Sequence, residues 1–364
     1  MKSVIRANKD MKPQIRQSNI ELLRIFAMIL IVAHHYAYHG GAYSSDITGF
    51  NQWIAIFLVA GGKLGVDLFV MITGYFMVES SFKIMRLIRL EAAVLFYSIV
   101  FYFIACLGLK IEQISFLTLR NAFLPTLTNL GNGYWFIPCY FGILIISPFI
   151  NRIIATLSKK QYQQLLFGLL LLISVIPTIL QSTPWFDGTM GIFILLYLLG
   201  GYIRRENISL PGTKKRVNLG ISICLYGCIV AMTMLVKTYV DFFGKFGISA
   251  EPIWSLNSFF VVMLAVVIFM FFIQVEIKPN EFINHVSKTT IGIYLIHDNL
   301  YVRQYMWLDI LHTDRYYTSK WLPLHAVCCV LVIFVVSAVV EQVRSVVMAP
   351  IMKKIGRSKF IESL

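Results

Sequence analysis

The sequence predicts an all-α polytopic membrane protein with about ten transmembrane helices and both termini in the cytoplasm. Of its 364 residues, 58% are hydrophobic and only 14% are charged, whereas about a quarter are charged in a typical soluble domain. The mean hydropathy is +0.73. Ten apolar stretches approach the roughly 20 residues that a helix needs to cross the hydrocarbon core. They run approximately over 20–38, 53–78, 90–108, 133–150, 165–181, 189–203, 217–236, 254–275, 289–302 and 321–343.

Positive charges recur in alternate connections between these stretches. With the N-terminal tail in the cytoplasm, the connections on that side hold 23 lysines and arginines, whereas the outer connections hold seven. This asymmetry follows the positive-inside rule. It accounts for the net charge of +14 without a nucleic-acid partner, and it predicts cytoplasmic termini.

We expect a single membrane domain over 20–345, with a cytoplasmic tail at 1–19 and another at 346–364. The first apolar stretch has no small-residue cleavage pattern, so it should remain as a span of a multi-pass protein of the cell membrane. The six cysteines fall within predicted spans and show neither disulfide nor zinc spacing, and we interpret them as packing residues. No group of His, Cys, Asp or Glu has the spacing of a metal site, so no metal is predicted.

The first predicted span carries the most informative polar residues. Arg24 and His35 lie in the oily segment IELLRIFAMILIVAHHY, and a charged side chain at membrane depth costs roughly 2.5 to 3.5 kcal/mol on insertion scales. The eleven steps along the helix from Arg24 to His35 bring both to within about 20° of one helix face, roughly 16 Å apart along the axis. Glu21 lies one turn before Arg24 and His39 one turn after His35, so this face predicts a polar track through the membrane.

Each of these residues also has a purely structural interpretation. Arg24 alone could extend its side chain to the inner headgroups, and a single buried histidine could simply bond a neighbouring helix. Their position on one face favours the functional interpretation. His34 points about 100° away from His35 and is predicted to pack or to form a hydrogen bond.

The pattern of Glu21, Arg24, Ala27 and His35 resembles the first-helix signature of the acyltransferase-3 family of integral membrane acyltransferases. The second span, GGKLGVDLFVMITGYFM, is similar to the next motif of that family. Weaker landmarks follow in the family's order over nearly the whole chain: a basic run at Lys83, Arg86 and Arg89, YWFIP from Tyr134, LLGGYIRR from Leu198, and TIGIYLIH ending at His297. The chain departs from the family where Glu21 replaces the commoner aspartate and where His34 precedes the expected histidine.

The resemblance implies an O-acetyltransferase that moves an acetyl group from cytoplasmic acetyl-CoA to a hydroxyl of an extracytoplasmic or cell-envelope polysaccharide, such as an exopolysaccharide. Acetyl-CoA would be a substrate, with no bound cofactor. His35 and Arg24 would be the catalytic residues, His35 either as general base or as the site of an acyl intermediate. Arg86 and Arg89, together with Lys83, would bind the phosphates of the donor, which arginine binds in bidentate fashion.

Several further residues have two open interpretations. Asp67 could orient a histidine, but pairing with Lys63 one turn away is the preferred interpretation. Tyr134 and Trp135 are interpreted as headgroup anchors, although aromatic faces also stack on sugars. His297 either helps to shape the acceptor side or forms a hydrogen bond between helices.

Two other functional classes remain open on the sequence. A polytopic transporter or flippase for a glycan or small substrate would also carry polar residues in its spans, although the chain shows no inverted repeat or paired broken helices. A noncatalytic membrane sensor would tolerate the loss of His35. The sequence predicts no particular oligomeric state.

Overall fold

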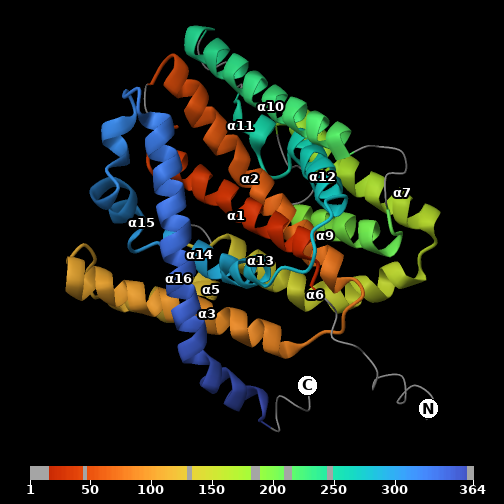
Figure 1. The fold of residues 1–364 in the computed structure, drawn as a ribbon, viewed down its shortest axis with the longest axis horizontal. Coiled ribbons are helices and arrows are strands. Elements are labelled where there is room, and N and C mark those ends of the chain that lie inside the picture. The colour runs from red at the N-terminus through yellow and green to blue at the C-terminus, as the bar shows by residue number, and fades with distance from the viewer. Residues whose placement is uncertain are drawn as a thin grey trace.

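The computed structural model describes residues 16–43, 47–128, 133–181, 189–208, 215–243 and 249–358. Within these ranges the chain forms helices joined by turns, and no strand occurs among them (Figure 1). The all-α prediction is therefore confirmed. Most of the predicted N-terminal tail, up to residue 15, and the last six residues of the C-terminal tail lie outside the described residues.

Eight helical segments of the described chain are long and apolar enough to cross a membrane, and each matches one predicted span. These segments are α1 (Ser18–Tyr38), α2 (Phe50–Met77), α3 with the π-helical η2 (Ile84–Leu109), α6 (Phe136–Thr156), α7 with η3 and α8 (Lys159–Leu180), α10 (Lys215–Phe243), α11 with α12 (Glu251–Ile273) and α16 (Leu322–Gly356). The protein is a multi-pass membrane protein, as predicted.

The sixth and ninth predicted spans correspond to shorter helices. The sixth is α9 (Thr189–Arg205), with 17 residues. The ninth is α14 (Thr290–His297), with 8 residues, which directly continues the helical turns of α13 (Glu281–Val286) and η4 (Ser287–Thr289). Seven of these eight residues are buried, so this segment is apolar because protein surrounds it. Hydropathy alone does not separate that cause from contact with lipid, and neither α9 nor α14 is among the eight candidate spans of the described chain.

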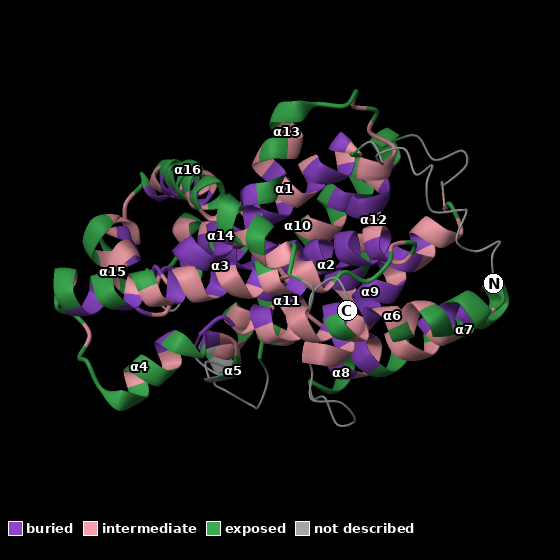
Figure 2. Ribbon diagram, turned by 90° about the horizontal axis from the view of Figure 1, so that it is seen from below, coloured by how far each residue is buried: buried purple, intermediate pink, exposed green. Residues whose placement is uncertain are grey.

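Short helices complete the described chain. They are α4 (Phe116–Phe123), α5 (Pro125–Thr128), α13 (Glu281–Val286), η4 (Ser287–Thr289), α15 (Arg303–Tyr305), η5 (Met306–Ile310) and η6 (Thr313–Tyr316). In Figure 2 much of this peripheral helix surface is exposed, as it is for α4, α13 and α15.

Helices α1 and α2 form the centre of the molecule, and α9, α12, α14 and α16 contact them (Figures 1 and 2). Glycines allow the close approach of these helices. A Cβ atom added at Gly65 would lie 2.5 Å from the Ala27 carbonyl oxygen, and one added at Gly200 would lie 2.0 Å from the Met71 carbonyl oxygen. These glycines are packing positions, because no larger side chain fits at these distances. The polar face of α1 is thus held inside the bundle.

Candidate active site

Two cavities lie along the polar face of α1. We call the first the histidine cavity; it has a volume of about 600 Å³, and its wall includes the histidines near the end of the helix, His34, His35 and His39. We call the second the arginine cavity; it has a volume of about 560 Å³ and is lined by Glu21 and Arg24 near the start of the helix. The helix repeat places the arginine and the histidines on one face, and the rise per residue places them at different depths.

In the histidine cavity, His34 and His35 project from the last turns of α1 toward different neighbours. The Nδ1 atom of His34 lies 2.7 Å from the Val59 carbonyl oxygen on α2, so its N–H donates to that oxygen. Gly62 makes room for this ring, since a Cβ atom there would lie 2.2 Å from Cγ of His34. The hydrogen-bonding role predicted for His34 is confirmed, and the residue also lines the cavity.

His35 contacts a histidine from a distant part of the chain. Its Nδ1 atom lies 2.9 Å from Nε2 of His297, which is the last residue of α14. The Nδ1 atom of His297 lies 2.6 Å from the Ile293 carbonyl oxygen, one turn earlier in the same helix. Both rings are buried, with 7% exposure for His35 and none for His297. Of the two interpretations of His297, the hydrogen bond between helices is the one observed.

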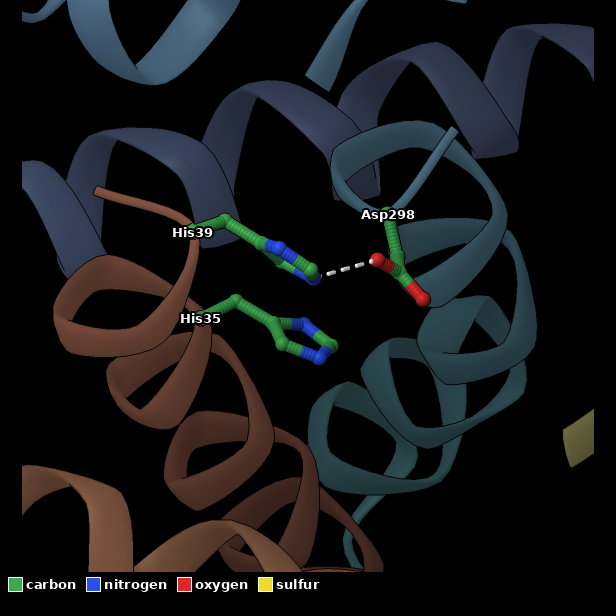
Figure 3. A group of neighbouring side chains, drawn as sticks. All are labelled: His35, His39 and Asp298. Atoms are coloured by element: carbon green, nitrogen blue, oxygen red, sulfur yellow. Dashed lines mark ion pairs between the residues drawn. The ribbon is translucent and has the colours of Figure 1, made fainter. Parts of the chain in front are cut away.

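Asp298 follows α14 and brings a carboxylate to the same place, as Figure 3 shows. Its Oδ1 atom lies 3.0 Å from Nε2 of His39 and 3.2 Å from Nη1 of Arg303. We call His35, His39 and Asp298 the outer cluster. Their potential metal ligands lie within 4.8 Å of one another, so the expectation of no metal-like cluster is wrong in geometry. That expectation used sequence spacing, and here the fold joins residues about 260 positions apart. The carboxylate is already paired with Arg303 and hydrogen-bonded to His39, which weakens a site for a metal cation.

The wall of the histidine cavity combines aromatic and polar side chains. Trp135 lines it, and the Lys63 ammonium lies 4.9 Å from the centre of the Trp135 ring. Tyr134 instead points into the protein: its hydroxyl donates to the Leu295 carbonyl oxygen over 2.6 Å, and only 4% of the residue is exposed. The interpretation of Tyr134 as a headgroup anchor is therefore wrong, because a buried ring bonded to α14 does not reach lipid.

Asp67 does not form the predicted pair with Lys63. The residue is fully buried, and among the described residues neither carboxylate oxygen has a hydrogen-bond partner. The ammonium of Lys63 lies over Trp135 instead. Asp67 also contacts no histidine of the cavity within hydrogen-bonding distance, so the structure brings it to neither of its predicted partners.

In the arginine cavity, Glu21 lies between two arginines. Its carboxylate oxygens lie 3.4 Å from Nη1 of Arg16 and 3.2 Å from Nη1 of Arg24. The Arg24 guanidinium also lies 5.8 Å from the centre of the Phe69 ring and 5.9 Å from that of Phe76. These contacts hold Arg24 among the surrounding helices, so its side chain does not simply extend toward the lipid headgroups.

Helix α3 contributes two of the predicted donor-binding residues to this cavity. Arg86 and Arg89 both line it, and Arg86 donates to the Ser80 hydroxyl over 3.2 Å. Lys83 precedes the helix as its N-cap residue and is exposed; it is not part of the cavity wall. The structure therefore groups the two arginines with Arg24 and separates the lysine from them.

Sequence reasoning missed an ion pair between a buried glutamate and a half-buried arginine in the same cavity. Glu341 and Arg344 of α16 form a bidentate pair, with N–O distances of 2.7 and 2.6 Å, and both line the cavity. The Tyr97 hydroxyl also donates to Glu341 over 2.8 Å. The sequence contained a signal for it, because Glu341 is an acidic residue within the tenth apolar stretch. A charged side chain at membrane depth is costly there, as it is for Arg24.

A family model described as an acyltransferase domain matches residues 17–341. The chain belongs to this acyltransferase-3 family. The match covers the histidine cavity and most of the arginine cavity, and it leaves out only Arg16 and Arg344 among the arginines described above. No curated protein and no solved structure matched the chain.

In this acyltransferase-3 protein the two cavities adjoin each other. Ile291 of α14 lines both of them. Phe69 also lines the histidine cavity, while its ring lies beside the guanidinium of Arg24. Five arginines and two glutamates line the arginine cavity, which leaves an excess of positive charge. The acyltransferase therefore holds a positively charged chamber next to a chamber that contains a buried imidazole.

Proposed function

We propose that this acyltransferase moves an acetyl group from cytoplasmic acetyl-CoA to a hydroxyl group of a cell-envelope polysaccharide. The observation that carries the proposal is the pairing of the two cavities on one helix: positive charge gathers around Arg24, and a hydrogen-bonded imidazole, His35, lies about three turns further along the same face. With both termini in the cytoplasm, the arginine cavity opens toward the side that contains acetyl-CoA. The protein would then reside in the cell membrane.

The arginine cavity suits the nucleotide end of the donor. Coenzyme A carries a diphosphate and a further phosphate, and guanidinium groups bind such oxyanions through paired, charge-assisted hydrogen bonds. Arg24 shares its charge with Glu21. Arg86, by contrast, has a neutral hydroxyl as its partner, and Arg89 is exposed at the cavity wall. These two side chains of α3 are therefore the best suited to take the phosphates.

The thioester arm of the bound donor would pass beside Ile291 and Phe69 to reach the histidine cavity. There Nε2 of His35 takes the proton of the acceptor hydroxyl while the hydroxyl oxygen attacks the thioester carbon. The carbon–sulfur bond breaks, and the departing thiolate takes the proton from Nε2, so the products are the acetyl ester and free CoA. In a second route, Nε2 attacks the thioester first and the acetyl group passes through His35.

The wall of the histidine cavity suits a sugar acceptor. Trp135, Trp254 and Tyr38 present aromatic rings, and Glu251 and Lys63 add polar groups. Aromatic faces with a few placed polar groups are typical of small-molecule sites that fix orientation. In the predicted topology this cavity lies beyond the arginines toward the outer side, which supports an acceptor that approaches from there.

The test is transfer of label from radioactive acetyl-CoA into envelope polysaccharide in membranes that contain the wild-type protein or His35→Ala at equal expression. His325→Ala is the matched control, because His325 also bonds α1, at Tyr36 over 2.8 Å, but lines neither cavity. We expect label in the wild type and in the control and none in His35→Ala. Absence of label in the wild type, with succinyl-CoA as well as acetyl-CoA, would favour a transporter or a sensor. Label that persists in His35→Ala would retain the enzyme and reject the mechanism.

A further inference from the structure

We infer that His297 is a positioning residue that fixes the tautomer of His35 and so holds the Nε2 lone pair ready for catalysis. The inference rests on the proposed function, since it assigns the residue that prepares its base. It goes beyond a simple link between helices, because it states which nitrogen of each ring carries the hydrogen. Two successive hydrogen bonds link the Ile293 carbonyl oxygen to His297 and His297 to His35.

The first hydrogen bond sets the tautomer of His297. Its Nδ1 atom lies 2.6 Å from the Ile293 carbonyl oxygen, and a carbonyl oxygen only accepts hydrogen bonds. The hydrogen therefore resides on Nδ1 of His297. In a neutral imidazole the other nitrogen then has no hydrogen, so Nε2 of His297 is an acceptor.

The second hydrogen bond sets the tautomer of His35 on α1. Nε2 of His297 lies 2.9 Å from Nδ1 of His35, and two lone pairs at that distance would repel each other. Nδ1 of His35 must therefore donate, and its Nε2 atom keeps the lone pair. His35 lines the histidine cavity, so this arrangement equips it as a base or nucleophile. The other neutral tautomer would present an N–H group, which cannot accept a proton.

The neighbouring carboxylate does not disturb this chain of hydrogen bonds. Asp298 is adjacent to His297 in sequence, but its Oδ1 atom contacts His39 and Arg303. The ring of His297 therefore takes its orientation from the backbone of α14, which is buried on nearly every side. A backbone carbonyl in a buried helix holds the His297 ring more rigidly than a mobile side chain would.

The experiment compares two substitutions of His297 with one control. His297→Leu removes the acceptor while keeping an apolar side chain, whereas His297→Gln retains an acceptor, because the amide oxygen can replace Nε2. His325→Leu is the control, since it also removes a histidine hydrogen bond to α1. For acetyl transfer in purified membranes we expect kcat to fall about 100-fold in His297→Leu, as for a misplaced general base, with both KM values within about twofold. We expect kcat of His297→Gln and of His325→Leu to stay within about tenfold of wild type.

A second measurement does not depend on turnover. Diethyl pyrocarbonate modifies the unprotonated nitrogen of a neutral imidazole, and mass spectrometry of peptides reports the rate at each histidine. In His297→Leu we expect slower modification of His35 and an unchanged rate at His34, whose own tautomer is set by Val59. An unchanged His34 rate also shows that the bundle is folded.

These results separate the inference from the proposed function. An unchanged kcat in His297→Leu, or equal losses in the leucine and glutamine variants with intact His34 reactivity, would overturn the positioning role. A wild type without acetyl transfer would contradict the proposed function alone, and the His35 modification rate would still decide the tautomer. An equal His35 rate in wild type and His297→Leu would reject the inference whatever the reaction.

Discussion

Arg86 and Arg89 offer the sharpest test of donor binding, because Lys83 lies on the same segment as a natural control. All three were predicted to bind the donor, yet only the two arginines line the arginine cavity, and Lys83 is exposed at the start of α3. The substitutions Arg86→Ala, Arg89→Ala and Lys83→Ala each remove one positive charge. If the arginine cavity binds the donor, only the first two should raise the KM for acetyl-CoA.

The expected rise in the KM for acetyl-CoA follows from the contacts of each side chain. A hydrogen bond to a charged group contributes about 1.5–3 kcal/mol, and each 1.4 kcal/mol changes an affinity about tenfold. Arg86 is partly buried and would exchange its bond to Ser80 for a phosphate, so we expect its loss to raise the KM about 100-fold. Arg89 is more exposed, and solvent screening should limit its effect to about tenfold. Lys83→Ala should change the KM less than about twofold.

The assay measures initial rates with two donors at constant ionic strength. Acetyl-CoA carries the phosphates, whereas the acetyl thioester of N-acetylcysteamine carries the same reacting group without them. The arginine variants should lose rate only with acetyl-CoA, because the short donor has nothing for the guanidinium groups to bind. Equal losses with both donors, or a Lys83 variant as impaired as the arginine variants, would refute the assignment of this cavity to the nucleotide.

Four further predictions follow from the fold. Glu341→Ala leaves the half-buried Arg344 unpaired and should destabilise the protein by about 1–3 kcal/mol, seen as a lower Tm in detergent; an unchanged Tm would contradict the pairing. Gly200→Ala places a Cβ 2.0 Å from the Met71 carbonyl oxygen and should cost about 1–3 kcal/mol, whereas Gly227→Ala meets nothing within 4 Å and should stabilise α10 by up to about 1 kcal/mol. EDTA should leave acetyl transfer unchanged, since the carboxylate of the outer cluster is already paired, and a loss that zinc restores would make the cluster a metal site. A reporter enzyme that is active only in the cytoplasm should be active when it is fused to either terminus.

The fold class and the first helix were predictable because both depend on local properties. Apolar stretches of sufficient length mark membrane helices, and eight of the ten predictions match such helices. Likewise, a helix has a fixed repeat of 3.6 residues, so Glu21, Arg24 and His35 had to share a face once α1 formed. The sequence is less informative for the ninth stretch, because burial in protein and contact with lipid select the same apolar residues.

By itself, the sequence determined that a helix with an arginine at one depth and a histidine at another passes through a membrane domain. Only the tertiary structure decided what each of them meets. Glu341 and Arg344 reach the arginine cavity from α16, and His297 reaches His35 from a helix 262 residues further along the chain. No periodicity connects such positions, because the contact depends on how α14 and α16 pack on α1. The spacing of residues along one helix is fixed by backbone geometry, whereas partners between helices are fixed by packing, which acts across the whole chain.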